Sequence, residues 1–554
     1  MTNFDYVELP KPKVSGFDLS YSNKLTMDIG DLVPVYKQEV LPGDEFKVGA
    51  NFMCRFAPLA NPIYTKLDAQ IHYFFVPNRL LWNGGTRGNN WETFITGGRD
   101  GNETPTPTYI KLSDIIYDMA GEANGDDSLG GMQSLHDYLG IPLFLGGDSD
   151  DIQQAESVKI NALPYLAYAK IYDDWFRDVN LTNSIFDTYE QLTDGGLIGD
   201  RDTPQYNTVT TIKRRAWSKD YFTSALPWAQ RGEEVRIPVG TTKFNYIAKL
   251  PNSQYPQINP LIKGVGSSEV YYAGTTSKFD VPNNVGTGGI YSPNIQLNAE
   301  ALGTIRELRN ASALQLWLEK NAVGGARYIE QLLAHFGVFN EDAKLQRAQY
   351  LGSVKSPVVI SEVQSNAATA EGELGELAGK AVSYANDFAF DEKFTEHGWI
   401  LGIMSIKPEA SYAEGIHRSL THRNEKLDYA FPEFAEIGLQ EINNSEIYGR
   451  SITANDGVFE GTFGYGERYG EYKTNTNEIH GYFKDGEDTR SQYNMTRFFG
   501  TTPELNTNFV QIFEQDLNNP FTDQSVNAGN IWVDVYNDVK AIRPLPKHSI
   551  PLFN

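Results

Sequence analysis

Hydrophobic and polar residues alternate along three stretches of the chain, and this pattern predicts half-buried β-strands. The stretches are residues 45–56, 66–77 and 531–542, and each puts apolar side chains on one face and mostly polar ones on the other. Because proline cannot donate to a strand ladder, we expect Pro77 to end the second strand. Residues 399–406, WILGIMSI, are apolar throughout, which favours a strand covered on both faces.

Helical spacing of apolar residues is less frequent. It predicts helices over residues 163–178, 304–320 and 326–337. Two stretches, 97–131 and 238–298, are rich in Gly, Pro, Asn and Asp or Ser and are expected to be long loops. The aromatic residues in them argue against plain disorder.

The first and last strand patterns lie near opposite ends of a 554-residue chain. A sandwich whose edge strands come from both chain ends, with large excursions between strands, is typical of a jelly roll. We therefore predict a mainly β fold, an eight-stranded antiparallel jelly-roll sandwich with long inter-strand loop insertions and a few helices. Residues 1–554 then form a single subunit, and we expect residues 238–298 to be a surface-projecting loop insertion within it.

Charge and cysteine content restrict the possible functions. The chain has 47 Lys+Arg against 71 Asp+Glu, a formal net charge of −24, which argues against nucleic-acid binding over the whole surface. With Cys54 as its one cysteine, the chain forms no intramolecular disulfide, which suits assembly in a reducing cytosol. The sequence shows no secretory signal and no run of about 18 apolar residues, so we expect no membrane insertion.

Patterns for catalysis or metal binding are weak. GELAGKAVS, residues 375–383, lacks the first glycine and the Ser/Thr of a phosphate-binding loop, and we interpret it as a Gly/Ala-rich loop. His417 and His422 are not at the i,i+4 spacing of a helical metal pair. Nothing marks out a carboxylate pair for glycoside hydrolysis. We therefore predict no enzymatic activity, no cofactor and no metal site.

Seven segments follow one another in a recognisable order. They are IGDLVPVYKQEVLPGDEFKV (29–48), FFVPNRLLW (74–82), INALPYLAYAKIYDDWFRDVNL (160–181), DYFTSALPW (220–228), HGWILGIMSI (397–406), FPEFAEIGLQEI (431–442) and FGYGERYGEYK (463–473). Together they resemble the major capsid protein of the microviruses, small tailless single-stranded DNA bacteriophages, and most closely the gokushovirus-like branch.

The resemblance implies a structural, non-catalytic protein of the virion. About sixty copies would form a T=1 icosahedral shell around circular single-stranded DNA, assembled in the cytoplasm of the host bacterium. It leaves open whether a scaffolding protein and a minor spike or pilot protein take part. The alternative function is a carbohydrate-binding β-sandwich protein that does not assemble into shells, because aromatic loops on such a fold suit sugar stacking.

Residues 213–232, KRRAWSKDYFTSALPWAQRG, gather five basic side chains against one acidic one. One interpretation places them on the inner face of a shell, where cations neutralise phosphate and rings stack on bases. The other pairs them with the surplus acidic residues of a neighbouring subunit, since interfaces favour Arg, Trp and Tyr. The candidate residues for either contact are Lys213, Arg214, Arg215, Trp217, Lys219, Tyr221 and Phe222.

Charge also predicts a partner. About sixty copies at −24 carry about 1,440 negative charges and enclose a polyanion, so packaging should need a small basic DNA-packaging protein.

In the 238–298 insertion, Tyr255, Tyr271, Tyr272 and Tyr291 are candidate contacts to a receptor on the bacterial surface. The alternative is that these tyrosines pack the insertion itself or a symmetry contact.

Overall fold

The computed structural model describes most of the chain. The described residues are 13–84, 89–99, 102–120, 132–142, 155–201, 203–232, 261–263, 270–272, 278–279, 305–323, 328–336, 341, 346–364, 377–449, 461–484, 492–513, 517–525 and 528–548. The chain divides into two compact units, one made of residues 1–229 with 324–554 and the other of residues 230–323. The two units are described separately below.

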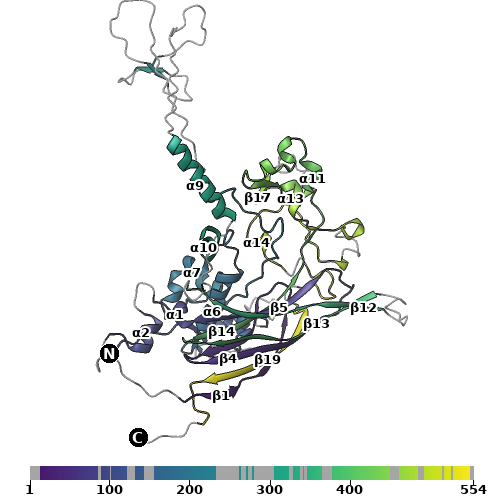
Figure 1. Cartoon of the computed structure of the whole chain (residues 1–554). Coiled ribbons are helices and arrows are strands. Elements are labelled where there is room, and N and C mark those ends of the chain that lie inside the picture. The colour runs from purple at the N-terminus through teal and green to yellow at the C-terminus, as the bar shows by residue number, and fades with distance from the viewer. Residues whose placement is uncertain are drawn as a thin grey trace, which may run out of the picture. The chain divides into compact units, whose positions relative to one another are not determined.

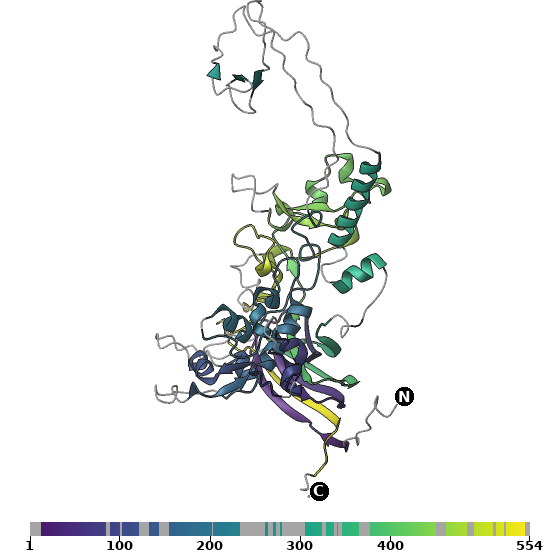
Figure 2. The same ribbon diagram turned by 90° about the vertical axis from the view of Figure 1, so that its left-hand side faces the viewer.

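A six-stranded antiparallel sheet brings the two ends of the chain together. Its strands lie in the order β1-β19-β4-β13-β12, and β2 also pairs with β19. They are β1 (Ser15–Asp18), β2 (Tyr21–Met27), β4 (Glu45–Phe56), β12 (Val359–Gln364), β13 (Leu377–Lys393) and β19 (Ile531–Arg543). Figures 1 and 2 show yellow β19 alongside the purple N-terminal strands. The prediction that strands from both chain ends share one sheet is therefore confirmed.

A second, four-stranded sheet has the order β11-β5-β14-β3. Its antiparallel strands are β3 (Val33–Val40), β5 (Leu67–Pro77), β11 (Gln349–Pro357) and β14 (Gly398–Pro408). β11 ends at Pro357 and β12 begins at Val359, so two strands separated by one residue belong to different sheets. At Gly352 the sheets come so close that a Cβ atom would lie 2.1 Å from the carbonyl oxygen of Ala389 in β13.

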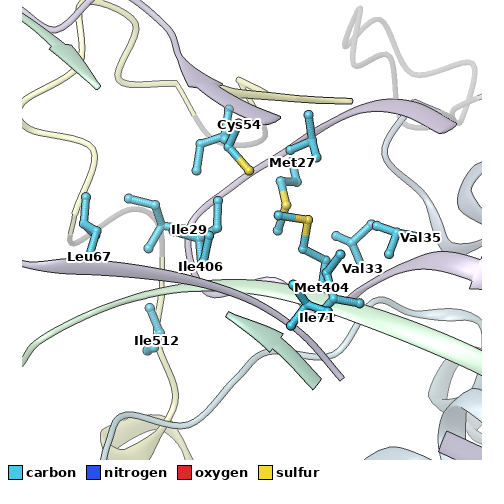
Figure 3. Close-up of a cluster of buried hydrophobic side chains, with 14 of the residues drawn as sticks. Met27, Ile29, Val33, Val35, Cys54, Leu67, Ile71, Met404, Ile406 and Ile512 are labelled. Atoms are coloured by element: carbon cyan, nitrogen blue, oxygen red, sulfur yellow. The ribbon is translucent and has the colours of Figure 1, made fainter. Parts of the chain in front are cut away.

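The inward faces of both sheets form one hydrophobic core, part of which is shown in Figure 3. In β4 every second side chain from Phe46 to Phe56 is buried, as the alternation predicted. β5 ends at Pro77, also as predicted, and β19 buries alternate residues. Burial raises the pKa of the Cys54 thiol to about 12, so this cysteine belongs to the core as a neutral side chain.

A second hydrophobic core lies on the outer face of the four-stranded sheet. There α6 (Leu163–Ile171) and α1 (Asn78–Leu81) pack against β5 and β14. Leu401 and Ile403 of β14 belong to this second core, whereas Ile400 and Met404 face the first. The prediction that this strand is covered on both faces is therefore confirmed. The mainly β, antiparallel sandwich is likewise confirmed; the count of eight jelly-roll strands stays a prediction.

Shorter elements fill the connections between the strands. They are α2 (Trp91–Thr96), β6 (Tyr109–Lys111), α3 (Leu112–Ala120), α4 (Leu135–Tyr138), β7 (Lys159–Asn161), α7 (Ile185–Thr188), α8 (Pro204–Thr210), α10 (Tyr328–Phe336), β15 (Ser411–Tyr412), α11 (Arg418–Thr421), β16 (Gln440–Asn443), α12 (Asn444–Ile447), β17 (Thr462–Gly466), α13 (Gly470–Lys473), β18 (Asn477–Glu478) and α14 (Thr507–Val510). A π-helix, Tyr172–Phe176, continues α6. No helix in the described part of the chain is long and apolar enough to cross a membrane.

Two sequence expectations need correction. Residues 97–131 are not loop throughout, because β6 and α3 form there and bury Ile110 and Ile115 in the second core. The Gly/Ala-rich stretch at 375–383 is also not a loop, because residues 377–383 are the first part of β13. Its pairing with β12 and β4 overrides the weak strand propensity of Gly and Ala.

The smaller unit, residues 230–323, contains α9 (Ile305–Val323) and three short strands. β8 (Leu261–Lys263), β9 (Val270–Tyr272) and β10 (Lys278–Phe279) form an antiparallel sheet in the order β10-β9-β8. The predicted helices at 304–320 and 326–337 correspond to α9 and α10, the latter in the larger unit. That residues 238–298 project from the subunit surface stays a prediction.

Candidate functional site

The basic stretch is a connecting segment inside the subunit, held by backbone hydrogen bonds on both sides. On one side Leu32 N–H donates to Lys213 O over 2.9 Å, and Arg215 N–H donates to Gly30 O over 2.7 Å. On the other side Ile512 N–H donates to Arg215 O over 2.9 Å. We call residues 213–222 the basic seam, because they join the start of β3 to the segment that follows α14.

Two cations of the basic seam have carboxylate partners in the same chain. Arg214 lies 3.6 Å from Asp31, and Lys219 lies 2.5 Å from Asp178. The Lys219 side chain is still 56% exposed, whereas that of Asp178 is 8% exposed. Lys219 is therefore the cation of the seam that remains most accessible to a second molecule while it is paired.

Lys213 and Arg215 have no carboxylate within ion-pair distance among the described residues. Arg215 Nη1 donates to Ser405 Oγ over 2.6 Å, and its guanidinium lies 5.5 Å from the ring centre of Phe176. Burial lowers the pKa of Lys213 to about 8 and that of Arg215 to about 10. The seam therefore holds positive charge that the described part of its own chain leaves uncompensated.

Three further basic side chains lie beside Arg215 on the outer face of the four-stranded sheet. Lys407 Nζ donates to Ser218 Oγ over 2.9 Å, and Lys355 lies 2.8 Å from the carboxylate of Asp68. Burial, then the charges of Arg215 and Lys407, lower the pKa of His72 to about 3. His72 is therefore uncharged at neutral pH, and we call its three charged neighbours Arg215, Lys355 and Lys407 the cation cluster. The sequence analysis missed Lys355 and Lys407, because they come from β11 and β14.

The aromatic residues of the seam face the hydrophobic core. Trp217 is buried, its Nε1–H donates to Gln511 O over 3.1 Å, and the Arg497 guanidinium lies 5.1 Å from its ring. Phe222 is buried 4.9 Å from the ring of Tyr412. Base stacking by Trp217 or Phe222 would therefore require the seam to open.

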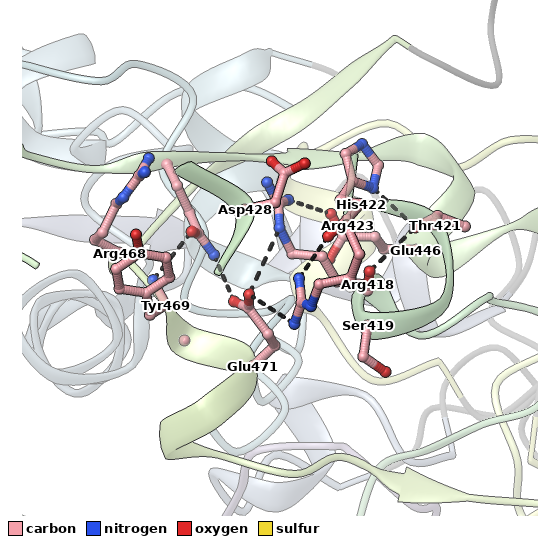
Figure 4. A network of polar contacts seen from close by, with 12 residues as sticks. Arg418, Ser419, Thr421, His422, Arg423, Asp428, Glu446, Arg468, Tyr469 and Glu471 are labelled. Carbon is pink, nitrogen blue, oxygen red and sulfur yellow. Dashed lines mark hydrogen bonds and ion pairs between the residues drawn. The ribbon is translucent and has the colours of Figure 1, made fainter. Parts of the chain in front are cut away.

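Tyr221 connects the seam to a buried polar network, shown in Figure 4. Its hydroxyl donates to Glu446 over 2.8 Å, and Glu446 also lies 2.7 Å from Arg418. Burial first, and then the charge of Glu446, raise the pKa of Tyr221 well above its usual range. The network anchors the C-terminal end of the seam to α11 and α12.

Glu471 of α13 is the second carboxylate of the network. It lies 3.8 Å from Arg418 and 3.6 Å from Arg423, and it accepts a 2.8 Å hydrogen bond from Gln440. Both glutamates are almost fully buried, so each depends on these partners for its charge. Beside the network is a cavity of about 340 Å³ whose lining includes Tyr221, Ile416, Arg418, Leu420, Glu446 and His480.

The predicted host-contact tyrosines are only partly covered by the structure. Tyr271 and Tyr272 are the last two residues of β9. Tyr255 and Tyr291 lie outside the described residues. In the described part of the chain, no three His, Cys, Asp or Glu side chains gather in a way that could hold a metal ion.

Comparison with known proteins matches the chain over almost its whole length. Residues 10–553 match the family described as capsid protein (F protein). The chain is 31% identical to Capsid protein VP1 of Chlamydia phage 1, covering 99% of this chain and 97% of that protein. It is 30% identical to Capsid protein VP1 of Bdellovibrio phage phiMH2K, covering 97% and 95%. For Capsid protein VP1 of Spiroplasma virus 4 the identity is 25%, with 98% and 95% covered.

Proposed function

The chain belongs to the microvirus capsid protein family, and we propose that it assembles into a small T=1 icosahedral shell around circular single-stranded DNA. The observation that carries this proposal is the match to capsid proteins over nearly the whole of both chains. A shell of this symmetry takes about sixty copies, which assemble in the cytoplasm of the host bacterium. The role is structural, as a component of the virion.

The fold supports this role through its long insertions. The sandwich is a single body built from both chain ends, whereas residues 78–348 and 409–530 are excursions between its strands. Closed shells need several different contact surfaces around each symmetry axis. Insertions of this size supply such surfaces without adding strands to the sandwich.

Electron microscopy of the purified, expressed chain tests assembly directly. Small isometric particles of uniform size are expected. A protein that stays monomeric or forms only a small oligomer under all assembly conditions would instead favour the carbohydrate-binding β-sandwich. Binding of that oligomer to a glycan array would then support the alternative function.

The geometry of the basic seam favours contact with a neighbouring subunit over contact with DNA. Trp217 and Phe222 of the seam are buried, while the cation cluster keeps charge that Asp68 offsets only in part. Each copy has 71 acidic against 47 basic residues, so a neighbour offers many carboxylates. The seam and the cluster would then join subunits within the wall of the shell.

Replacing Lys213, Arg214 and Arg215 together by alanine separates the two interpretations. A role in subunit contact predicts folded chains that no longer form shells. A role in DNA contact predicts normal shells with less DNA, measured as the ratio of absorbance at 260 and 280 nm. Circular dichroism of the variant distinguishes lost assembly from lost folding.

Two further partners belong to this proposal. Because a shell of negatively charged subunits repels DNA, virions should contain a small Lys/Arg-rich peptide, which mass spectrometry of purified particles would detect.

Residues 238–298 with Tyr255, Tyr271, Tyr272 and Tyr291 are proposed to contact the host surface. Deleting that insertion should leave particles that no longer adsorb to cells.

A further inference from the structure

The outer face of the six-stranded sheet exposes four aromatic rings. Trp532 and Tyr536 of β19 are 49% and 43% exposed, and Tyr384 and Phe388 of β13 are 58% and 51% exposed. Their sequence neighbours point into the core, so these rings lie on the opposite face by the alternation of a strand. Four exposed rings on one face of a sheet form a group, unlike the single exposed apolar residues that are normal on a protein surface.

The strand register places these rings on a regular grid. In each strand the two rings are four residues apart, which corresponds to about 13 Å along the strand. β4 lies between β19 and β13, and the register offsets the two pairs by two residues, so neighbouring rings of the two pairs are about 10 Å apart across the sheet and about 7 Å apart along it. The outward positions of β4 between them are Arg55, Met53, Asn51 and Gly49, and Lys47 lies one outward position beyond, with its Nζ 5.8 Å from the centre of the Phe388 ring.

A hollow of about 530 Å³ adjoins this grid. Trp532, Met53 and Arg55 line it from the sheet, and Met132 and Gln133 line it from the segment before α4. The volume falls in the range of small-ligand sites, and the lining combines an indole, two thioethers and a guanidinium. Lys24, Asp137 and Asp534 also line the hollow, so it has room for a flat ring beside Trp532 while the two carboxylates offset the positive charge.

Charge on this face is close to balanced. Lys24, Lys47, Arg55 and Lys540 share it with Asp18, Asp391, Asp534 and Asp538. Few phosphates can be neutralised by so few cations, so a polyanion would gain little here from charge alone. The rings offer a different source of affinity, since stacking on a base requires no positive charge.

We propose that this face, which we call the stacking face, binds single-stranded DNA mainly through its bases. Trp532, Tyr536 and Tyr384 stack on unpaired bases, while Arg55 and Lys47, which lies over the Phe388 ring, contact the DNA backbone. The inference rests on the proposed function, which puts single-stranded DNA inside the container. It also explains how a chain of charge −24 can contact a polyanion.

Equilibrium binding of a fluorescent twelve-nucleotide oligo(dT) to the purified full-length chain tests the proposal. Replacing Trp532 and Tyr384 together by alanine should weaken binding about 5- to 150-fold for each base that loses its ring. Trp532→Phe, which keeps a ring, should lose much less. The matched control is Phe431→Ala with Tyr482→Ala, two rings that are 49% and 64% exposed outside this face, and it should bind as the parent does.

Two further probes separate stacking from charge. An abasic oligomer of the same length keeps the phosphates and should bind far more weakly than oligo(dT). The slope of log K against log salt concentration should be shallower than about −2, because it scales as about −0.7 per phosphate neutralised. Equal affinity for the abasic oligomer, or unchanged binding by the double variant, would overturn the proposal.

Particle formation is followed separately by electron microscopy. If the double variant folds but forms no particles, the face is a contact between copies and the stacking proposal is wrong. If it forms normal particles and has lost oligo(dT) binding, the proposal is supported. If the parent chain itself forms no particles, the shell proposal fails, and the oligonucleotide measurements still decide whether the face binds DNA.

Discussion

In this capsid protein the outer face of the four-stranded sheet is buried, whereas that of the six-stranded sheet is exposed. On the four-stranded sheet, Leu401 and Ile403 are buried in a second core with α6, and the basic seam passes beside them. On the six-stranded sheet, Trp532 and Tyr384 remain about half exposed. The difference shows where the chain places its inserted helices: α1 and α6 cover the four-stranded sheet, whereas the rings of the six-stranded sheet stay about half exposed.

The largest effect is expected where the seam meets the buried polar network. Glu446→Ala removes the carboxylate that faces both Arg418 and the Tyr221 hydroxyl. Breaking a buried pair leaves an uncompensated charge and should lower the free energy of unfolding by about 3–5 kcal/mol. Urea unfolding followed by fluorescence measures the loss.

Glu467→Ala is the matched control for this variant. Glu467 pairs with Lys473 at the surface, with its side chain 67% exposed, and its loss should cost less than about 1 kcal/mol. Equal losses for both glutamates would mean that the network does not anchor the seam. The covered side would then owe its stability to the second hydrophobic core alone.

A pair of truncations compares the two faces directly. Leu401→Ala leaves a cavity under α6 and should lower the free energy of unfolding by about 2–5 kcal/mol. Tyr384→Ala removes a larger side chain from the exposed face and should change it by less than about 1 kcal/mol. If Tyr384→Ala lowers the free energy of unfolding as much as Leu401→Ala does, the exposed face is part of the folded core and the two faces do not differ.

The covered face should also be the one that is sensitive to acid. His72 has a folded-state pKa of about 3 against an ordinary value of 6.5, chiefly because of burial. Between these values the unfolded chain binds a proton that the folded chain does not, so stability is lost as pH falls below 6.5. From pH 7 to pH 5 this residue alone should cost about 2 kcal/mol.

His72→Gln removes this titration and serves as the test. Urea midpoints of the variant should fall less between pH 7 and pH 5 than those of the parent chain. Carboxylates elsewhere titrate equally in both proteins and cancel in the comparison. Parallel pH profiles would show that His72 is not held neutral by its surroundings.

Local pattern was sufficient to predict four strands of the two sheets, because burial on one face leaves a period of two in the sequence, and it gave no prediction for β1, β2, β3, β11 or β12. It predicted β4, β5 and β19, and the continuous apolar run of β14 even indicated the second core. It failed at the start of β13, where Gly and Ala carry no pattern and pairing with neighbours decides the structure. Long-range pairing is the information that a local window lacks.

The candidate sites show the same limit. The basic seam was visible as a run of charges, but Lys355 and Lys407 of the cation cluster come from other strands and carry no local signal. Trp532 and Tyr536 did leave a signal, since they are aromatic residues at positions that the alternation assigns to the polar face. Aromatic residues on the polar side of a predicted strand therefore indicate rings that the fold leaves exposed.

The smallest effect on folding, and the one most specific for assembly, is expected from Lys355→Ala. Lys355 is half exposed and pairs with Asp68, so its loss should change stability by less than about 1 kcal/mol. If the cation cluster receives carboxylates of a neighbour, the variant should form fewer particles than the parent, and the gap should narrow as salt screens the contact. Lys540→Ala, an equally exposed lysine of the six-stranded sheet paired with Asp18, is the matched control. Light scattering across a salt series measures particle formation. If both variants form equally fewer particles, the loss reflects the net charge of the chain and not the cation cluster. The two sheets would then not differ in their part in assembly.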